Sequence, residues 1–268
     1  MIDARAFAEF ERVILNDPGG RGVASFARPG EFESACRALA TARRVGIVTG
    51  FYIPTADACE TDGPLGACHL AKAIQRFARA AVCTDQWCLP VVQSLIPQAT
   101  DDPSILEDCD ALVAIERLGR AADGRYYSMR GADLTEWTEP LDEIFLRRRS
   151  GVATVGVGDG GNEIGMGSVL DRVKDVVTFG ESIGSVVSTD HLVAAGVSNW
   201  GAWGLIAGLS LFHPQIELPT PDAAFTDLIT LVAAGAVDGV TGHPNLTVDG
   251  LDWSHHSEIL EWLTALSP

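Results

Sequence analysis

The stretch VATVGVGDGGNEIGMG (152–167) decides the fold class, because a short apolar run passes directly into a cluster of glycines. Residues 152–157 have the largely uninterrupted apolar character of a strand that is buried on both faces, which is typical of parallel sheets. The glycines that follow indicate a loop at the carboxyl edge of that sheet. In open parallel sheets, ligands bind beyond this edge.

Strand and helix patterns alternate on both sides of this stretch. Further strands are predicted at 45–49, 81–84, 111–115, 176–179 and 191–195, and helices at 1–16, 30–42, 62–80, 86–95, 140–150, 198–212, 223–234 and 255–266. Strands separated by helices predict a parallel sheet that is covered on both faces. We therefore expect a three-layer α/β/α Rossmann-like fold with a mostly parallel sheet. One domain is expected over residues 1–268, with the helical segment 1–42 packed on its core.

Charge and composition argue against several classes of protein. The chain has 19 Lys and Arg against 36 Asp and Glu, a formal net charge of −17, which disfavours partners such as nucleic acids and anionic membranes. No segment reaches the ~20 apolar residues of a membrane helix, and the first residues resemble neither a signal peptide nor a transit peptide. The six cysteines form no CxxC pair, which is typical of reduced thiols. A cytoplasmic protein is the expectation.

Polar residues follow two other predicted strands at the same edge of the sheet. Glu60 and Asp62 come after a long loop, and they could be catalytic groups or acids that cap the next helix. Arg117, Arg120 and Asp123 follow the strand at 111–115. An arginine fork could bind a substrate carboxylate, and simple surface ion pairs are the alternative.

The glycine loop itself holds Asp159, Asn162 and Glu163. Its GxGxxG spacing at 156–161 could indicate dinucleotide binding. Two later glycines weaken the helix that such a fingerprint needs, by roughly 1 kcal/mol each, and the two acids would repel a pyrophosphate. The loop is better suited to a cation, a polar amine or a general acid, and a tight turn with positive φ is the structural alternative.

Ser198 and Asn199 follow the strand at 191–195 and begin a helix. Free backbone N–H groups at such a helix start could bind a carboxylate or a phosphate. The sequence contains no GxSxG, HExxH or GxxxxGK[ST] motif. Serine-triad hydrolysis, zinc peptidase chemistry and P-loop phosphotransfer therefore lack support.

Five motifs resemble, in order, the D-glutamate cyclase-like C-terminal domain family: ETDGPLGA (60–67), ERLGRAADGRYYSMRG (116–131), GVGDGGNEIGMG (156–167), AAGVSNWGAWGLIAGL (194–209) and TVDGL (247–251). The resemblance implies a Rossmann-like three-layer fold. It also implies a lyase reaction in which D-glutamate, a small amino dicarboxylate, loses water to give 5-oxo-D-proline. In the animal enzyme this domain is fused behind a hydro-lyase-related domain, so a separate hydro-lyase-like partner subunit is an alternative expectation.

That reaction needs a base, an acid and recognition of charge. We expect Arg117 and Arg120 to hold the α-carboxylate and Asp123 to belong to the substrate-binding set. The base and the acid are expected among Glu60, Asp62, Asp159 and Glu163, and the groups that bind the developing oxyanion among Asn162, Ser198 and Asn199. Alternatively these acids hold Mg²⁺ or Mn²⁺, with Asp62, Asp159 and Glu163 as candidate ligands.

Two functions of other classes stay open at this stage. One is a non-catalytic domain that binds a ligand or a partner. The other is a Rossmann-like enzyme that binds a nucleotide through the loop at 156–161. A homo-oligomer is also compatible with the sequence.

Overall fold

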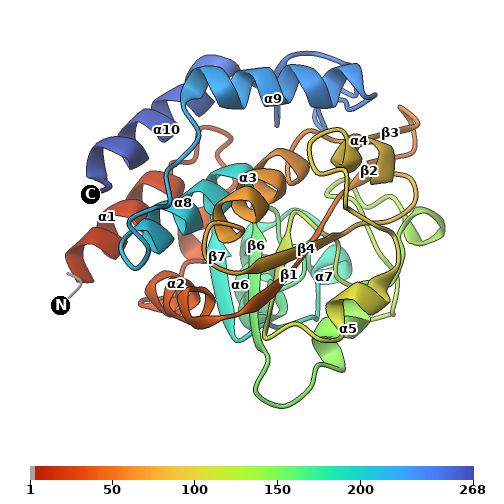
Figure 1. Cartoon of the computed structure of the whole chain (residues 1–268). Coiled ribbons are helices and arrows are strands. Elements are labelled where there is room, and N and C mark those ends of the chain that lie inside the picture. Colours follow the sequence, from red (N-terminus) through yellow and green to blue (C-terminus); the bar gives the residue numbers. More distant parts are fainter. Residues whose placement is uncertain (1–3) are drawn as a thin grey trace.

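The computed structural model describes residues 4–268 and is built around a five-stranded parallel sheet (Figure 1). The strand order is β4 (Arg79–Cys83), β1 (Arg44–Thr49), β5 (Ala111–Ile115), β6 (Ala153–Gly158) and β7 (His191–Ala194), and each neighbouring pair is parallel. The order reverses beside β1, because the chain goes from β1 to β4 on one side and then to β5 on the other. A crevice beyond the carboxyl ends of the strands forms at such a point.

Helices cover both faces of the sheet, which confirms the three-layer α/β/α prediction. One face carries α1 (Ala4–Ile14), α2 (Glu31–Thr41), α3 (Pro64–Ile74) and α8 (Ser198–Ser210), with α9 (Pro221–Ala233) and α10 (Trp253–Leu266) outermost (Figure 1). The other face carries α5 (Asp142–Leu146), α6 (Leu170–Val176) and α7 (Gly180–Ile183). The short helix α4 (Leu89–Gln93) follows the edge strand β4, and four 3₁₀ turns complete the set: Val23–Ser25, Pro103–Leu106, Thr135–Trp137 and Gly167–Val169.

The main hydrophobic core lies between the sheet and α8, whose residues are all buried. A helix that is apolar on every side must be enclosed by other elements, and here α1, α2 and α3 enclose it. Glycines in α8 allow this close approach: a Cβ on Gly208 would lie 2.3 Å from Cys36 Sγ. The N-terminal helices α1 and α2 therefore form part of the core.

The structure differs from the prediction in several elements. The strand expected at 176–179 is wrong, because Val176 ends α6 and Gly180 begins α7. Val176 and Phe179 are exposed, and a short apolar run does not distinguish a buried strand from such an exposed helix end. The helix expected to reach residue 80 ends at Ile74, and two hairpins were not predicted, β2 (Tyr52–Ile53) with β3 (Ala58–Cys59) and β8 (Thr247–Val248) with β9 (Leu251–Asp252).

Of the helices between residues 4 and 268, none combines the length and the apolar composition that are needed to cross a bilayer.

Candidate functional site

Three carboxylates from three different loops meet beyond the carboxyl ends of the strands. Asp62 lies before α3, Glu116 follows β5 and Asp159 follows β6. Each offers an oxygen, and these three oxygens lie within 4.8 Å of one another. All three side chains are buried. We call Asp62, Glu116 and Asp159 the carboxylate cluster.

Two further acids surround the carboxylate cluster. Glu60 is buried against the loop before β8, where a Cβ on Gly239 would lie 1.9 Å from Glu60 Oε2. Asp249 lies in the turn between β8 and β9 and adopts a left-handed backbone with φ 56°. Its negative charge raises the pKa of Glu60 and of Asp62. Through Asp249, the last third of the chain thus contributes to the site at the carboxyl edge of the sheet.

The acids are held in an environment that favours their protonated forms. Burial, together with the neighbouring carboxylates, raises the pKa of Glu60 and Glu116 well above the usual value, and burial does the same for Asp159. Burial and the charge of Asp249 raise the pKa of Asp62 to about 7, although two backbone hydrogen bonds lower it. Groups this close take up protons as a set, so the protonation of each member of the carboxylate cluster depends on that of the others.

Arg21 is the cation that faces these acids. Its Nη1 lies 2.6 Å from Asp159 Oδ2, and its Nη2 forms an ion pair with Asp249. The charge of Arg21 lowers the pKa of Asp62, of Asp159 and of Asp249. Arg21 pairs with two of the five carboxylates, so the acids of the site outnumber the cations that contact them among residues 4–268.

Glu116 is held in a strained conformation. Its φ of 44° is left-handed, which costs a non-glycine residue on the order of 1–3 kcal/mol. Ser198 Oγ donates a 2.6 Å hydrogen bond to Glu116 Oε2, and Gly63 leaves room for the side chain, since a Cβ there would lie 2.6 Å from Glu116 Cβ. Such strain persists where the surroundings enforce it, most often at functional sites.

Asp62 does not cap α3 as the sequence suggested. Gly63 is the residue before α3, and Asn199 Oδ1 accepts the N–H groups of Gly63 and Gly66 at 3.0 and 2.7 Å. Asp62 instead accepts the N–H groups of Ser198 and Asn199 at 2.9 and 2.8 Å. The expectation of free N–H groups at the start of α8 is therefore wrong, because the carboxylate of the protein itself fills that position.

Glu163 holds the glycine loop in shape. Its carboxylate accepts the N–H groups of Asp159, Gly160 and Gly161 at 3.0, 2.6 and 2.6 Å. Gly161 has φ 112°, so the tight turn with positive φ is present. A pyrophosphate would need these same N–H groups, and Glu163 is engaged with them rather than with the carboxylate cluster.

Arg117 and Arg120 are both engaged in ion pairs of their own. Arg117 is buried, pairs with Asp85 and donates to the carbonyls of Gly50 and Glu139 at 2.9 and 2.7 Å. Arg120 donates to both oxygens of Asp142 at 2.7 and 2.8 Å. The structure does not bring either guanidinium together with the carboxylate cluster.

Tyr127 links the two remaining predicted residues. Asn162 Nδ2 donates to the carbonyl of Tyr127 at 2.7 Å, and Asn162 Oδ1 is buried without a hydrogen-bond partner. The Tyr127 hydroxyl donates to Asp123, which is exposed. The amide donor of Asn162 is thus in use, whereas Asp123 lies on the surface.

Three residues of the site were not predicted. Glu116 begins one of the motifs but has no role in the predicted site, although its place directly after a central strand is a usable signal. Asp249 belongs to the TVDGL motif without an assigned role. Arg21 lies in the glycine-flanked turn after α1, and no local signal in the sequence connects it to the other loops.

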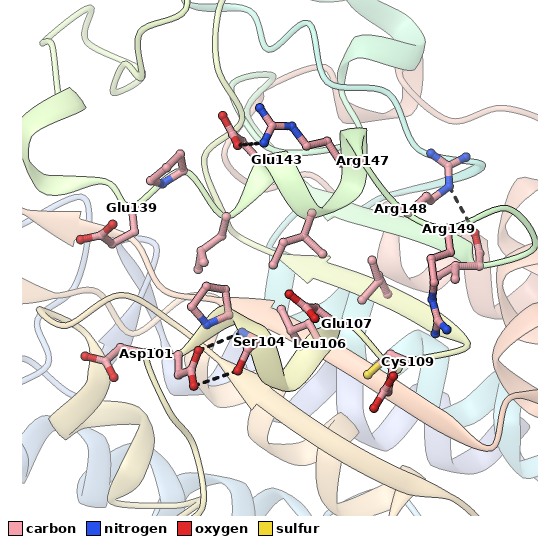
Figure 2. A pocket seen from close by; sticks show the side chains of 18 residues that line it. Asp101, Ser104, Leu106, Glu107, Cys109, Glu139, Glu143, Arg147, Arg148 and Arg149 are labelled. Atoms are coloured by element: carbon pink, nitrogen blue, oxygen red, sulfur yellow. Dashed lines mark hydrogen bonds and ion pairs between the residues drawn. The ribbon is translucent and has the colours of Figure 1, made fainter.

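A groove of about 730 Å³ lies elsewhere in the molecule, between α5 and the 3₁₀ turn Pro103–Leu106 (Figure 2). Arg147, Arg148 and Arg149 line it together with several acids, and Figure 2 shows Arg147 paired with Glu143. No member of the carboxylate cluster lines this groove. The candidate site is therefore identified by its chemistry and by its position at the sheet edge.

A family model and a human relative both match this chain. The family described as D-glutamate cyclase-like, C-terminal, matches residues 10–264. The human protein named D-glutamate cyclase, mitochondrial, is 33% identical over 312 aligned positions, which cover 95% of this chain and 51% of the human protein. The chain thus spans about half the length of this relative. Because the family match covers nearly all of the chain, the protein belongs to the D-glutamate cyclase-like C-terminal family.

Proposed function

We propose that the protein catalyses the cyclisation of D-glutamate to 5-oxo-D-proline with loss of water. The observation that carries the proposal is the buried carboxylate cluster, whose members have raised pKa values and lie at the sheet edge within the family's motifs. The name of the human relative supports the same substrate. A set of acids that differ in protonation can supply both a base and an acid.

The reaction sets clear requirements for proton transfer. The α-ammonium must lose a proton before its nitrogen attacks the γ-carboxyl carbon, where a C–N bond forms and a C–O bond breaks. Two protons leave the nitrogen in all, and two arrive on the oxygen that departs as water. Asp62, with a pKa of about 7, is suited to accept a proton, and Glu116, with its pKa raised well above the usual value, is suited to donate one.

As an alternative to proton transfer by Asp62 and Glu116, we propose that Mg²⁺ or Mn²⁺ binds at the carboxylate cluster, where it would displace the protons of both side chains. The donors fit, because all three are carboxylate oxygens, which both ions prefer, and they converge within 4.8 Å. Asp159 Oδ2 supports the fit, since it is buried and accepts no hydrogen bond. When bound, the cation would polarise the γ-carboxyl group. Glu116 replaces Glu163 in the proposed ligand set, because Glu163 is engaged with backbone N–H groups.

A second candidate rests on the coverage of the human relative, of which this chain spans about half. In this alternative the domain binds D-glutamate but needs a hydro-lyase-like partner subunit for turnover.

One experiment separates the two candidates. Purified protein is incubated with D-glutamate or L-glutamate and Mg²⁺ or Mn²⁺, and the product is identified by chiral chromatography with mass detection. The proposed function predicts 5-oxo-D-proline from D-glutamate. Binding of D-glutamate without product would favour the second candidate, and absence of both binding and product would contradict the proposal.

A further inference from the structure

We propose that Arg21 binds the α-carboxylate of the substrate, and that it exchanges its ion pair with Asp159 for the substrate when a divalent cation occupies the carboxylate cluster. This inference rests on the proposed function. It assigns the recognition of substrate charge to a loop near the N-terminus, in place of Arg117 and Arg120.

Arg21 lies between two loops of the candidate site. Its guanidinium spans from Asp159, on the loop after β6, to Asp249, in the turn between β8 and β9. The side chain is 25% exposed, compared with 5% for Asp159. Arg21 is therefore the group that a substrate coming from solvent would meet before it reaches the buried acids.

The backbone that carries Arg21 is fixed. Asp17 accepts the N–H groups of Arg21 and Gly22 at 2.9 and 2.7 Å. Gly20 and Gly22 supply the left-handed turns, with φ 65° and 75°. The guanidinium can therefore change position by rotation about its side-chain bonds, while the backbone of the loop keeps its conformation.

The pairing with Asp159 is suited to exchange. Nη1 is 2.6 Å from Asp159 Oδ2, yet the contact lacks the geometry of a hydrogen bond, and that buried oxygen accepts no other. A carboxylate oxygen in this state is a good ligand for a cation. A divalent cation on Asp159 would repel the guanidinium and leave Nη1 available for an anion. Binding of the cation and binding of the substrate should therefore favour each other.

The chemistry of the ligand follows from this arrangement. Nη2 keeps its ion pair with Asp249, so Nη1 can donate a charge-assisted hydrogen bond to a carboxylate of the ligand. When the amine and the γ-carboxyl group of a substrate lie at the carboxylate cluster, a second carboxylate of the same molecule is needed to contact Arg21. The site should therefore select amino dicarboxylates over amino monocarboxylates of the same length.

The test measures binding rather than turnover. Affinities for D-glutamate and for 4-aminobutyrate, which lacks the α-carboxylate, are measured by calorimetry with and without Mn²⁺. The proteins are the wild type, Arg21→Ala, Arg21→Lys and the control Arg12→Ala, chosen because the Arg12 side chain is 71% exposed and pairs with Glu9 on the same helix. Circular dichroism checks the folding of each variant, and Arg21→Lys keeps the charge if Arg21→Ala does not fold.

With Mn²⁺ present, Arg21→Ala should bind D-glutamate roughly 10- to 100-fold more weakly, and 4-aminobutyrate as the wild type does. Arg21→Lys should lie between the two. Mn²⁺ alone should bind Arg21→Ala at least as tightly as the wild type, because a competing cation has gone. Unchanged affinity for D-glutamate, or an equal loss for both ligands, would overturn the assignment.

The two proposals can fail separately. Binding that depends on Arg21, but without any 5-oxo-D-proline, would overturn only the cyclisation. Turnover by the wild type with an unchanged KM in Arg21→Ala would overturn only the role of Arg21.

Discussion

Asp62 and Asn199 cap each other's helices. Asp62 accepts the first two N–H groups of α8, and the side chain of Asn199, at the start of α8, accepts N–H groups at the start of α3. Asn199 Nδ2 also donates to the carbonyl of Thr61 at 3.1 Å. These hydrogen bonds connect the loop that carries Asp62 to the start of α8. Ser198, at the start of α8, donates a hydrogen bond to Glu116.

Replacing Asn199 should therefore destabilise the fold. Asn199→Ala leaves the buried N–H group of Gly66 without its acceptor and that of Gly63 with Asp62 Oδ1 alone, which should lower the free energy of unfolding by about 1–3 kcal/mol. The measurement is equilibrium unfolding in urea. Asn245→Ala is the matched control, because Asn245 is exposed and should change stability by less than about 0.5 kcal/mol. Equal effects of the two substitutions would contradict the reciprocal capping.

The protein without a divalent cation should become less stable as the pH rises from 6.5 to 8. A carboxylate whose folded pKa is raised binds more protons in the folded state, so its stabilising contribution is lost as the pH passes through that folded pKa. Asp62, with a pKa of about 7, acts in this window, and Glu116, whose pKa burial raises well above its usual value, changes stability in the same direction. The pKa values of the buried His69 and His256 are lowered, so both histidines are neutral there.

Glu116→Gln should make this dependence on pH shallower and stabilise the protein at pH 8, because one repelling charge is gone. Urea unfolding at several pH values measures the effect, and the exposed Glu107 supplies the control Glu107→Gln. A wild-type stability that rises from pH 6.5 to 8 would count against the raised pKa values.

A divalent cation should stabilise the folded protein. Mn²⁺ or Mg²⁺ at about 100 times its Kd should add about 2.7 kcal/mol to the free energy of unfolding, seen as a higher Tm that a chelator reverses. The shift should be lost in Glu116→Gln and kept in Glu107→Gln. If the wild type shows no shift at saturating concentrations of either ion, the proposed metal site is wrong.

Gly63 should be intolerant of a side chain. Gly63→Ala introduces a Cβ 2.6 Å from Glu116 Cβ at a φ of 88°, whereas Gly235→Ala, at a φ of 107°, meets nothing within 4 Å. Both variants carry the backbone cost, roughly 1 kcal/mol. Gly63→Ala should lose about 1–3 kcal/mol more and also lower kcat, because Glu116 must move. Equal stability and activity of the two variants would show that Glu116 is not held against Gly63.

Much of the fold could be predicted from the sequence, because the signals are local. The apolar runs that became β1, β5, β6 and β7 end at glycine or polar residues, and each forms a buried parallel strand. The exception at 176–179 is also local in origin, since four residues are too few to show whether the period is that of a helix or of a strand.

The membership of the site could be predicted only in part. Asp62 and Asp159 were expected because each lies in a polar loop at the carboxyl edge of the sheet. Their partners could not be read locally: Asp62 bonds to residues 136 and 137 positions away. Arg117 was expected to contact the substrate. A buried arginine needs an acid as its partner, and in the folded chain that partner is Asp85, 32 positions away in the sequence.

The central claim is tested most directly by the turnover of D-glutamate in the wild type, Glu116→Gln and the control Glu107→Gln, with Mg²⁺ or Mn²⁺ present and 5-oxo-D-proline measured by chiral mass analysis. We expect product from the wild type and from Glu107→Gln, and a kcat reduced roughly 10²- to 10⁴-fold in a folded Glu116→Gln. Full activity of Glu116→Gln, or no product from wild-type protein, would contradict the claim.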